Sequence, residues 1–392
     1  MTALEGITVV DLTRVLSGPY CTMLLADLGA RVVKVEQPGK GDDTRAWGPP
    51  FVNGESAYFL SVNRNKESIT LNLKHAEGLA LVHALVAKAD VLVENFRPGT
   101  LDKVGLDYES LRERYPRLVY CAISGFGHTG PRRAEAGYDA VMQAEGGLMS
   151  ITGAAGGPPF RLGVAIADVA TGMFAAHGIM AALVARQRTG CGQKVDIGML
   201  DSVAALLSYQ AGIYFATGSA PIRMGNRHPT IVPYETFTAA DGEFVLAVGN
   251  DDQWRRFCDA AGIERDERFA TNRQRVTSYD TLRPILAKRL AGETRAHWID
   301  RLRAAGVPCG SVRDLEELFA DPQIAAREMA AEVDHPTIGR MRVLGTPFKL
   351  SETPASVRTP PPTLGQHTQS ILVNDLGRTS DQVAALRAAG VV

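Results

Sequence analysis

The chain has 392 residues, of which 45% are hydrophobic and 22% are charged. Its 42 basic and 43 acidic residues give a formal net charge of −1, so no overall electric field draws it to nucleic acid or to a membrane surface. Because one hydrophobic core seldom grows past about 250–300 residues, this length predicts two domains.

The N-terminal part alternates strand patterns with helix patterns. Residues rich in β-branched side chains predict strands at 6–12, 31–38, 68–73, 90–96 and 117–126, and helical periodicity predicts helices at 21–30, 76–89 and 108–115. Such alternation is typical of a parallel sheet covered on both faces by helices. We therefore predict an α/β fold for this part of the chain.

Two further helices, at 169–187 and 199–217, complete the predicted large domain, residues 1–220. A segment rich in Gly and Pro then predicts a linker, and residues 221–321 are expected to form a smaller α+β domain with a hairpin that turns on Asp241–Gly242. Helices are predicted at 253–262, 281–292 and 297–306. Residues 322–392 form a third segment, which mixes extended stretches with a Pro-rich run and ends in a short helix.

The five cysteines lie far apart, with no CxxC pair and no Cys/His set at metal-ligand spacing. This usage predicts a cytoplasmic enzyme with reduced thiols and no metal site. The N-terminus has no basic segment followed by an apolar stretch, and no run of about 18 apolar residues is free of charge. We expect a protein that is neither exported nor membrane-spanning.

A single acid, Asp168, lies in a run of small and apolar residues, RLGVAIADVATGM. Charged side chains are almost never fully buried unless paired, because an unpaired ion loses its hydration. Two interpretations are open. Asp168 either caps the helix predicted at 169–187, where aspartate is favoured, or it has a chemical task.

Several common site motifs are missing. Glu36 ends the second strand, where an acid often holds the ribose of a dinucleotide, but the first turn carries Gly18 alone instead of three glycines. The chain also has no GxxxxGK[ST] phosphate loop, no HExxH and no GxSxG. These absences argue against a nicotinamide-dependent oxidoreductase, a nucleotidase, a metalloprotease and an esterase of the familiar types.

The chain resembles the family III CoA-transferases, which include formyl-CoA and carnitine CoA-transferases, in blocks that follow one another along nearly its whole length. These blocks are GITVVDLTRVLSGPYCTMLLADLGARVVKVEQPGKGDDTR, NRNKESITLNLK, ENFRPGTLDKVGL, SGFGHTGP with GYDAVMQAEGGLMSITG, the Asp168 run, GVPCG and LGQHT. Three segments, GDDTRAWGPPF, LSVNRNKESI and TIVPYETF, are most similar to the branch that uses succinyl-CoA and glutarate or hydroxymethylglutarate.

The resemblance implies that Asp168 is the nucleophile. With an unperturbed pKa of about 3.9, an aspartate is ionised at neutral pH and needs no neighbouring base to attack a thioester. The family mechanism runs through an aspartyl mixed anhydride and an aspartyl-CoA thioester, and water must be excluded because it would hydrolyse both.

The resemblance also implies where coenzyme A binds. CoA thioesters are expected as substrates, with no permanently bound cofactor. The implied contacts include cations for the phosphates and an aromatic ring for the adenine. They fall on Arg14, Val15, Leu16, Leu71, Lys74, Asn95, Phe96, Arg97, Lys103, Tyr138 and Asp139.

A short dicarboxylate acceptor needs a partner for its distal carboxylate, and a guanidinium provides a bidentate clamp. The candidates are Arg45, Arg64, Arg161, Arg227 and His228. Where formyl-CoA transferase carries a run of glycines as a lid over the intermediate, this chain has MGNRHPT, with Gly225 alone.

Two alternatives remain at the level of sequence. A racemase with a related fold pairs the acid with a histidine in a GHD segment, where this chain has GYD, so Tyr138 takes the place of the histidine and His128 falls elsewhere. A non-catalytic acyl-CoA-binding protein is the other alternative. The resemblance further implies a Rossmann-like large domain, a C-terminal segment that returns to it, and an interlaced homodimer.

Overall fold

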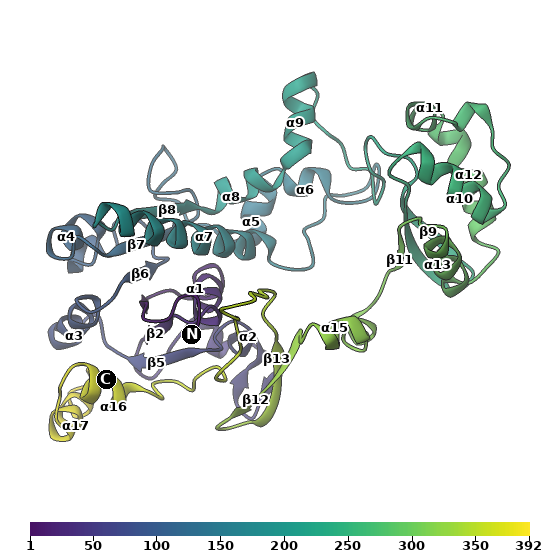
Figure 1. The fold of residues 1–392 in the computed structure, drawn as a ribbon. Helices are drawn as coiled ribbons and strands as arrows, with labels where there is room; N and C mark the ends of the chain where they lie inside the picture. The colour runs from purple at the N-terminus through teal and green to yellow at the C-terminus, as the bar shows by residue number, and fades with distance from the viewer. The chain divides into compact units, whose positions relative to one another are not determined.

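The structure, a computed structural model, describes residues 1–392 and divides them into two compact units (Figure 1). Unit 1 consists of residues 1–148, 161–212 and 322–392, and unit 2 consists of residues 149–160 and 213–321. The expected α/β class with a smaller α+β part is confirmed.

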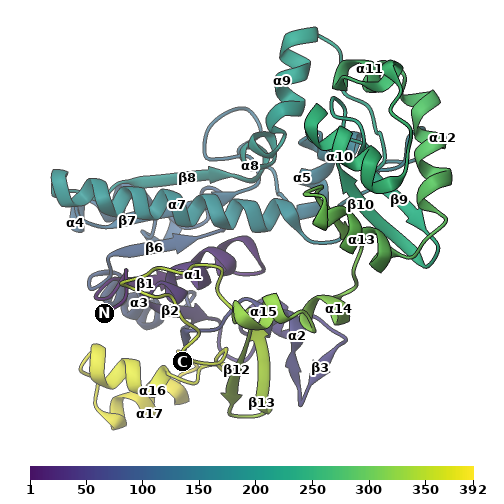
Figure 2. The ribbon, with the colours of Figure 1, turned by 45° about the vertical axis from the view of Figure 1, so that its right-hand side comes forward.

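Unit 1 is built on a six-stranded parallel sheet in the order β5-β2-β1-β6-β7-β8 (Figure 2). The strands are β1 (Thr8–Asp11), β2 (Arg31–Glu36), β5 (Lys66–Thr70), β6 (Val91–Glu94), β7 (Val119–Ser124) and β8 (Lys194–Gly198). The chain runs outward from β1 in one direction through β5 and then in the other from β6. In open parallel sheets, ligands bind outside the carboxyl ends of the strands at such a reversal, here between β1 and β6.

The central strands β1, β6 and β7 are largely apolar on both faces because helices cover both sides of the sheet. Val9 and its neighbours pack against α1 (Ser17–Asp27) and α7 (Ile166–Thr189), whereas Val10 and its neighbours pack against α3 (Ala76–Val86) and α4 (Tyr108–Arg114). Shorter elements of unit 1 are η1 (Asp43–Ala46), β3 (Phe51–Val52), β4 (Glu55–Ser56), α2 (Ala57–Ser61), η2 (Asp102–Val104), α5 (Asp139–Glu145) and α6 (Leu148–Ile151), whose last three residues belong to unit 2.

Two sequence predictions in this region were incomplete. Strand β8 was missed because polar Lys194 and Asp196 alternate with apolar residues in a short segment at the sheet edge. The predicted helix 199–217 is two helices, α8 (Met199–Leu206) and α9 (Ser208–Thr217), and the positive φ of Ser208, 43°, interrupts it.

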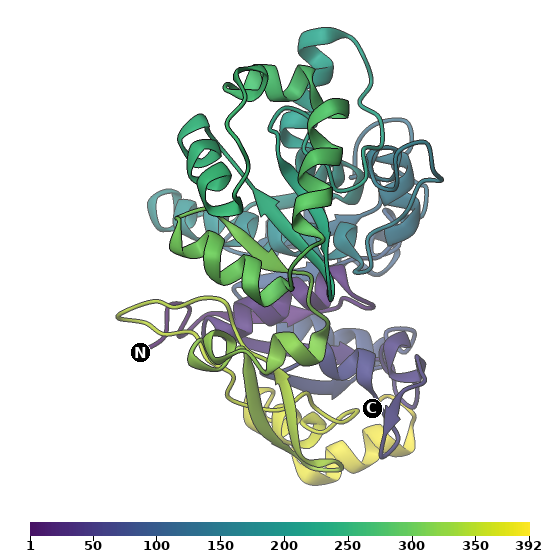
Figure 3. The ribbon, with the colours of Figure 1, turned by 90° about the vertical axis from the view of Figure 1, so that its right-hand side faces the viewer.

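The C-terminal segment packs on the sheet of unit 1. It contains α15 (Pro322–Ala326), the hairpin β12 (Ala330–His335) and β13 (Gly339–Leu344), α16 (Thr368–Ser370), η4 (Ile371–Asp375) and α17 (Ser380–Ala388). Ile371 and Leu372 join the core beside α3, and Asp375 pairs with Arg31 of β2 at 2.6 Å. Figure 3 shows this yellow segment beside the purple strands of the same unit.

Unit 2 contains a three-stranded sheet in the order β11-β10-β9. Its expected hairpin is present, but it turns on Ala240 and Asp241, one residue earlier than predicted, because Gly242 already pairs with Ala239. Its elements are β9 (Tyr234–Ala239), β10 (Gly242–Ala247), α10 (Asp251–Ala261), η3 (Glu267–Phe269), α11 (Asn272–Thr277), α12 (Tyr279–Leu290), α13 (Arg295–Ala304), β11 (Cys309–Ser311) and α14 (Leu315–Phe319). Residues 149–160 and 213–220 cluster here instead of with the large domain. Residues 149–160 belong to unit 2 because the guanidinium of Arg223 donates hydrogen bonds to the carbonyls of Ser150 and Gly157.

Candidate active site

Asp168 lies in the first turn of α7 and does not cap it. The helix begins at Ile166, two residues before the acid, and its N-cap residue is Ala165, which has no capping side chain. The carboxylate of Asp139 serves that purpose: Oδ1 accepts hydrogen bonds from the backbone N–H groups of Ala167, at 2.9 Å, and Asp168, at 3.4 Å. The capping interpretation of Asp168 was therefore wrong, and its side chain is not engaged in closing its own helix.

The residues around Asp168 are apolar. Ala165 packs against a cluster of Leu16, Met23 and Val62, and Ala167 is buried in a second cluster with Met142. A carboxylate in such surroundings loses much of its hydration. Asp168 itself is partly buried.

The first turn of α1 faces Asp168. The hydroxyl and the backbone N–H of Ser17 lie close enough to its carboxylate to lower its pKa. The two helices approach closely at Gly172, where an added Cβ would lie 2.5 Å from the carbonyl oxygen of Ser17. Only glycine at this position lets the N-terminus of α1 reach Asp168.

Burial and, to a smaller extent, the nearby Asp139 raise the pKa of Asp168, Ser17 lowers it, and the net result is a pKa of about 7. The expectation that this acid is fully ionised at neutral pH is therefore corrected: near pH 7 its two protonation states are comparably populated. Tyr58 lies in the same field, since burial and the charge of Asp168 raise its pKa to about 12.

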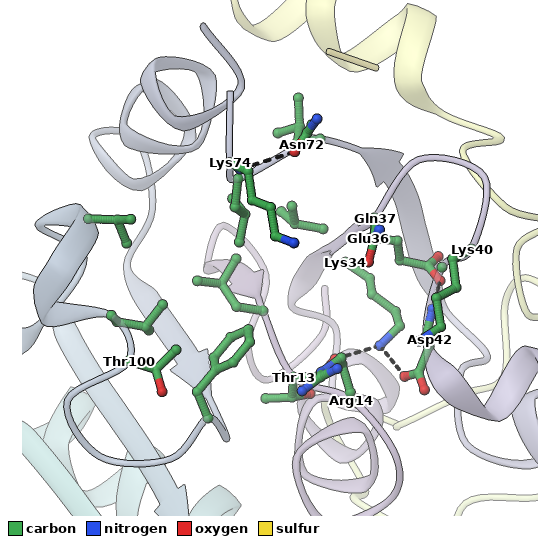
Figure 4. A pocket seen from close by; sticks show the side chains of 18 residues that line it. Thr13, Arg14, Lys34, Glu36, Gln37, Lys40, Asp42, Asn72, Lys74 and Thr100 are labelled. Carbon is green, nitrogen blue, oxygen red and sulfur yellow. Dashed lines mark hydrogen bonds and ion pairs between the residues drawn. The ribbon is translucent and has the colours of Figure 1, made fainter. Parts of the chain in front are cut away.

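A cavity of about 290 Å³ opens at the carboxyl ends of β1, β2, β5 and β6 (Figure 4). One part of its wall is apolar, made by Leu71, Leu73, Phe96, Leu101 and Val104, and the cationic side chains that line it are those of Arg14, Lys34, Lys40 and Lys74. Its place at the reversal of strand order is where open parallel sheets bind ligands. An apolar wall next to cations suits a flat ring that carries phosphates.

Four of the residues implied to contact CoA line this cavity: Arg14, Leu71, Lys74 and Phe96. Arg14 lies over the ring of Phe96, 5.2 Å from its centroid, and pairs with Asp43 at 3.1 Å. Val15 and Leu16 follow Arg14 in the loop that leads to α1.

The other candidates lie elsewhere. The Asn95 amide is engaged with the backbone of Arg14, donating to its carbonyl at 2.7 Å and accepting from its N–H at 2.9 Å. Arg97 lines a second cavity, of about 480 Å³, with Glu94, His128 and Lys194. Candidates outside both cavities are the exposed Lys103 in η2, and Tyr138 and Asp139 at the start of α5, next to Asp168.

Two of the proposed acceptor clamps are already occupied. Arg45 forms a bidentate pair with the buried Glu36, at 2.7 Å, and Arg64 pairs with the buried Asp27 at 2.6 Å. Both arginine side chains are themselves largely buried. Each guanidinium already holds a carboxylate of the protein, and the one buried nitrogen of the two that is left without a hydrogen-bond partner is Nη1 of Arg64, so these two assignments are withdrawn.

Three acceptor candidates remain. Arg161 is exposed in the segment before α7, and its guanidinium donates only to the carbonyl of Leu162. In unit 2, Arg227 lies over the ring of Tyr279, 3.4 Å from its centroid, and His228 stacks on Tyr234 at 5.2 Å. The segment around Gly225 is tied to unit 2 by a hydrogen bond from its N–H to the carbonyl of Gly153.

Sequence reasoning missed three residues that shape the site: Ser17, Lys34 and Asp42. Ser17 faces Asp168, whereas Lys34 and Asp42 form a buried pair at 2.9 Å below the loop after β1. A lysine between valines in the middle of the strand RVVKVE was the available signal, because an unpaired buried lysine is very costly.

Residues 4–368 match the model of CoA-transferase family III. The chain is 44% identical to succinyl-CoA:glutarate CoA-transferase of Mus musculus, over 100% of this chain and 91% of that protein. It is 45% identical to acetyl-CoA:oxalate CoA-transferase of Acetobacter aceti, over 88% of this chain and 89% of that protein. A crystal structure of a CaiB/BaiF family protein from Brucella suis, 44% identical, superposes with a TM-score of 0.85 and covers 95% of this chain and 99% of that one. The chain belongs to CoA-transferase family III.

Proposed function

We propose that this protein transfers CoA from succinyl-CoA to a short dicarboxylic acid, with Asp168 as the nucleophile. The observation that carries the proposal is a carboxyl group in apolar surroundings that faces the hydroxyl and the backbone N–H of Ser17 in the first turn of a second helix. The substrate pair follows from the mouse relative, whose name gives succinyl-CoA and glutarate and which matches over the whole chain.

The chemistry needs no metal and no redox group. The ionised Asp168 attacks the thioester carbonyl, which gives a mixed anhydride and releases CoA as a thiolate. The thiolate attacks the aspartyl carbonyl, forming an aspartyl-CoA thioester and freeing succinate. The acceptor carboxylate attacks this thioester, releasing the thiolate again, and the thiolate then takes the acyl group of the acceptor and restores Asp168.

The N-terminal turns of α1 and α7 would stabilise negative charge in these steps. The N–H groups at a helix N-terminus carry partial positive charge and favour an anion. The Ser17 N–H is already directed at the carboxyl oxygens, so it would stabilise the oxyanion that forms when the aspartyl carbonyl is attacked. The apolar clusters around Ala165 and Ala167 would limit access of water to the anhydride.

We further propose that the 290 Å³ cavity binds the adenine end of CoA. The adenine would lie against Leu71 and Phe96, and the phosphates would meet Arg14, Lys40 and Lys74. CoA thioesters would then enter and leave as substrates, without a permanently bound cofactor.

For the acceptor we propose a guanidinium clamp by Arg161 or Arg227, the arginines left after Arg45 and Arg64 are withdrawn. Arg227 lies on the ring of Tyr279, and its Nε is buried without a hydrogen-bond partner. The racemase alternative gains no support from the structure, because His128 lines the second cavity beside Glu94 and Lys194.

A homodimer in a reducing compartment, the cytoplasm, is also proposed. Met173, Phe174 and Val184 of α7 are 44%, 39% and 56% exposed, and a second copy of the chain would cover them. The five cysteines are free thiols. Helix α7 is long and apolar enough to cross a membrane by length and composition, but half of its most apolar window is buried inside the structure, so we propose a core helix.

Replacing the nucleophile tests the mechanism directly. Asp168→Asn should form no covalent CoA adduct when mixed with succinyl-CoA, and its turnover should fall by at least about a thousandfold, because no other group can carry the acyl-CoA bond. Intact-protein mass spectrometry after rapid quenching and calorimetric titration with CoA are the measurements. An Asp168→Asn protein that binds CoA normally and still turns over would refute the assignment.

The pKa of Asp168, about 7, gives a pH dependence with a definite sign. Only the ionised form attacks, so the rate of adduct formation should fall about tenfold per pH unit below 7 and level off above it. Because the folded state holds this proton more tightly than the unfolded chain, Asp168→Asn should be more stable than the wild type above pH 7, on the order of 2–4 kcal/mol, and the difference should vanish near pH 4. Stopped-flow kinetics and thermal unfolding against pH measure both; a rate that is flat from pH 5 to 8 would contradict the prediction.

The proposed CoA cavity can be tested at an exposed cation. Lys74→Ala should raise KM for succinyl-CoA roughly 3–10-fold and leave kcat within about twofold, because a phosphate contact far from the reacting carbonyl strengthens ground state and transition state alike. Steady-state kinetics would show the change. Lys288→Ala, which removes an exposed lysine of α12 in unit 2, is the matched control and should change neither constant.

The acceptor is tested by a panel of acids with succinyl-CoA as donor. Glutarate and other short dicarboxylates should give kcat/KM values at least about tenfold above those of monocarboxylates of similar length, since only a dicarboxylate can use a guanidinium clamp. Product acyl-CoA is followed by liquid chromatography. If oxalate with acetyl-CoA as donor gives the highest kcat/KM, the proposed substrate pair is wrong, and the protein resembles the acetyl-CoA:oxalate CoA-transferase of Acetobacter aceti in its substrates.

A further inference from the structure

The loop between β1 and α1 contains a strained residue. Val15 has φ of 71°, and it is the one β-branched residue among the five non-glycine residues with positive φ. A β-branched side chain in this left-handed conformation costs free energy, and it persists only where the surrounding structure holds it. Some contact around Val15 must therefore impose this turn.

Side chains from β2, from η1's N-cap and from the residue after β6 form hydrogen bonds with the backbone of the loop between β1 and α1. The Val15 N–H donates to Asp42 Oδ1 at 3.2 Å, and the ammonium of Lys34 bridges Asp42 Oδ2, at 2.9 Å, and the carbonyl oxygen of Thr13, at 2.8 Å (Figure 4). From the side, the Asn95 amide brackets the backbone of Arg14, as described above. Every residue from Thr13 to Val15 is thus fixed through its backbone.

The pair below the loop is fully buried, with the side chains of Lys34 and Asp42 both 0% exposed. Burying an ion pair seldom stabilises a protein more than well-packed apolar residues of the same size would, so burial alone does not account for it. Lys34 donates to the carbonyl of Thr13 in the loop and to Asp42, whereas Asp42 accepts from Val15 of the loop and also caps η1, where its Oδ1 accepts from the N–H and hydroxyl of Thr44. A role in setting the conformation of the loop fits these contacts.

The other end of the loop reaches the nucleophile. Two residues after Val15, Ser17 opens α1, and its N–H and hydroxyl face the carboxylate of Asp168 and lower its pKa. The carbonyl of Ser17 lies against Gly172 of α7 with no room for a Cβ. A rotation of the Val15 turn would therefore move the Ser17 donors away from the carboxylate.

We propose that Lys34 and Asp42 are positioning residues for the transfer reaction, which hold Val15 in its left-handed turn and thereby hold the Ser17 donors on Asp168. This inference rests on the proposed function of Asp168 as nucleophile. Neither residue touches the reacting atoms; both act through the backbone of the loop.

The test is the response of Asp168 to loss of the pair. Lys34→Met should slow adduct formation with succinyl-CoA roughly 10–100-fold, as expected for a shift of about 1 Å in an active-site donor. It should also move the acidic limb of the rate upward by about 0.5–1 pH unit, because the Ser17 donors lower the pKa of Asp168 against burial and against Asp139. Asp42→Asn keeps an acceptor for the Val15 N–H, so it should shift the acidic limb in the same direction but by a smaller amount. It replaces Lys34→Met as the test variant if Lys34→Met folds poorly.

A second substitution separates positioning from simple loss of stability. In a Val15→Gly background the turn is free of strain and needs no support, so Lys34→Met should there slow adduct formation by less than about threefold. The control is Asp27→Asn, which breaks the buried pair with Arg64 at the other end of α1. It should lower the melting temperature without moving the acidic limb.

These measurements also distinguish a failure of this inference from a failure of the proposed function. The pH at which the difference in melting temperature between wild type and Asp168→Asn stops growing and levels off reports the pKa of Asp168 in the folded protein, without any turnover. If wild type forms no adduct, the proposed function fails, and the melting comparison in the Lys34→Met background still tests the positioning role. An unchanged pKa in that comparison, or an equal loss of rate in the Val15→Gly background, would overturn the inference.

Discussion

The site depends on the contact between α1 and α7 at Gly172. Because glycine has no side chain there, the first turn of α1 lies directly against α7, and Ser17 reaches the carboxylate of Asp168. Neither helix can supply both elements alone: α7 carries the acid, and α1 carries its donors. The sheet beneath fixes both helices on the same face, through the core around Val9, Cys21 and Ala175.

The electrostatics of Asp168 are a balance between opposing influences. Burial raises its pKa to about 7 with help from Asp139, which at the same time caps α7, and Ser17 opposes both. For a nucleophile this balance is useful. A carboxylate stripped of part of its hydration attacks more readily than one in water, and donors held in place can stabilise the charge that appears in later steps.

Charge is used differently on the CoA side of the protein. Among the cations that line the cavity wall, Lys74 is exposed, and Arg14 and Lys40 share a surface ion pair with Asp43, whereas the buried Lys34 is engaged with the loop and with Asp42. The same division explains the acceptor candidates. Arg45 and Arg64 are structural because each meets a buried carboxylate of its own unit, so the arginine of a recognisable motif need not be the arginine that binds substrate.

The sequence by itself determined the fold class, the family and the place of the Asp168 run, because hydrophobic periodicity and the order of motif blocks are local properties of the chain. It also gave the cavity residues Leu71 and Phe96, which end or follow strands of a parallel sheet. It did not determine the pKa of Asp168, the role of Asp139, the engagement of Asn95 with Arg14 or the pairing of Lys34 with Asp42. Each of these joins residues from different elements, and only their packing decides burial and the distance between charges. For the same reason the short edge strand β8, whose pairing with β7 is long-range, escaped the sequence pattern.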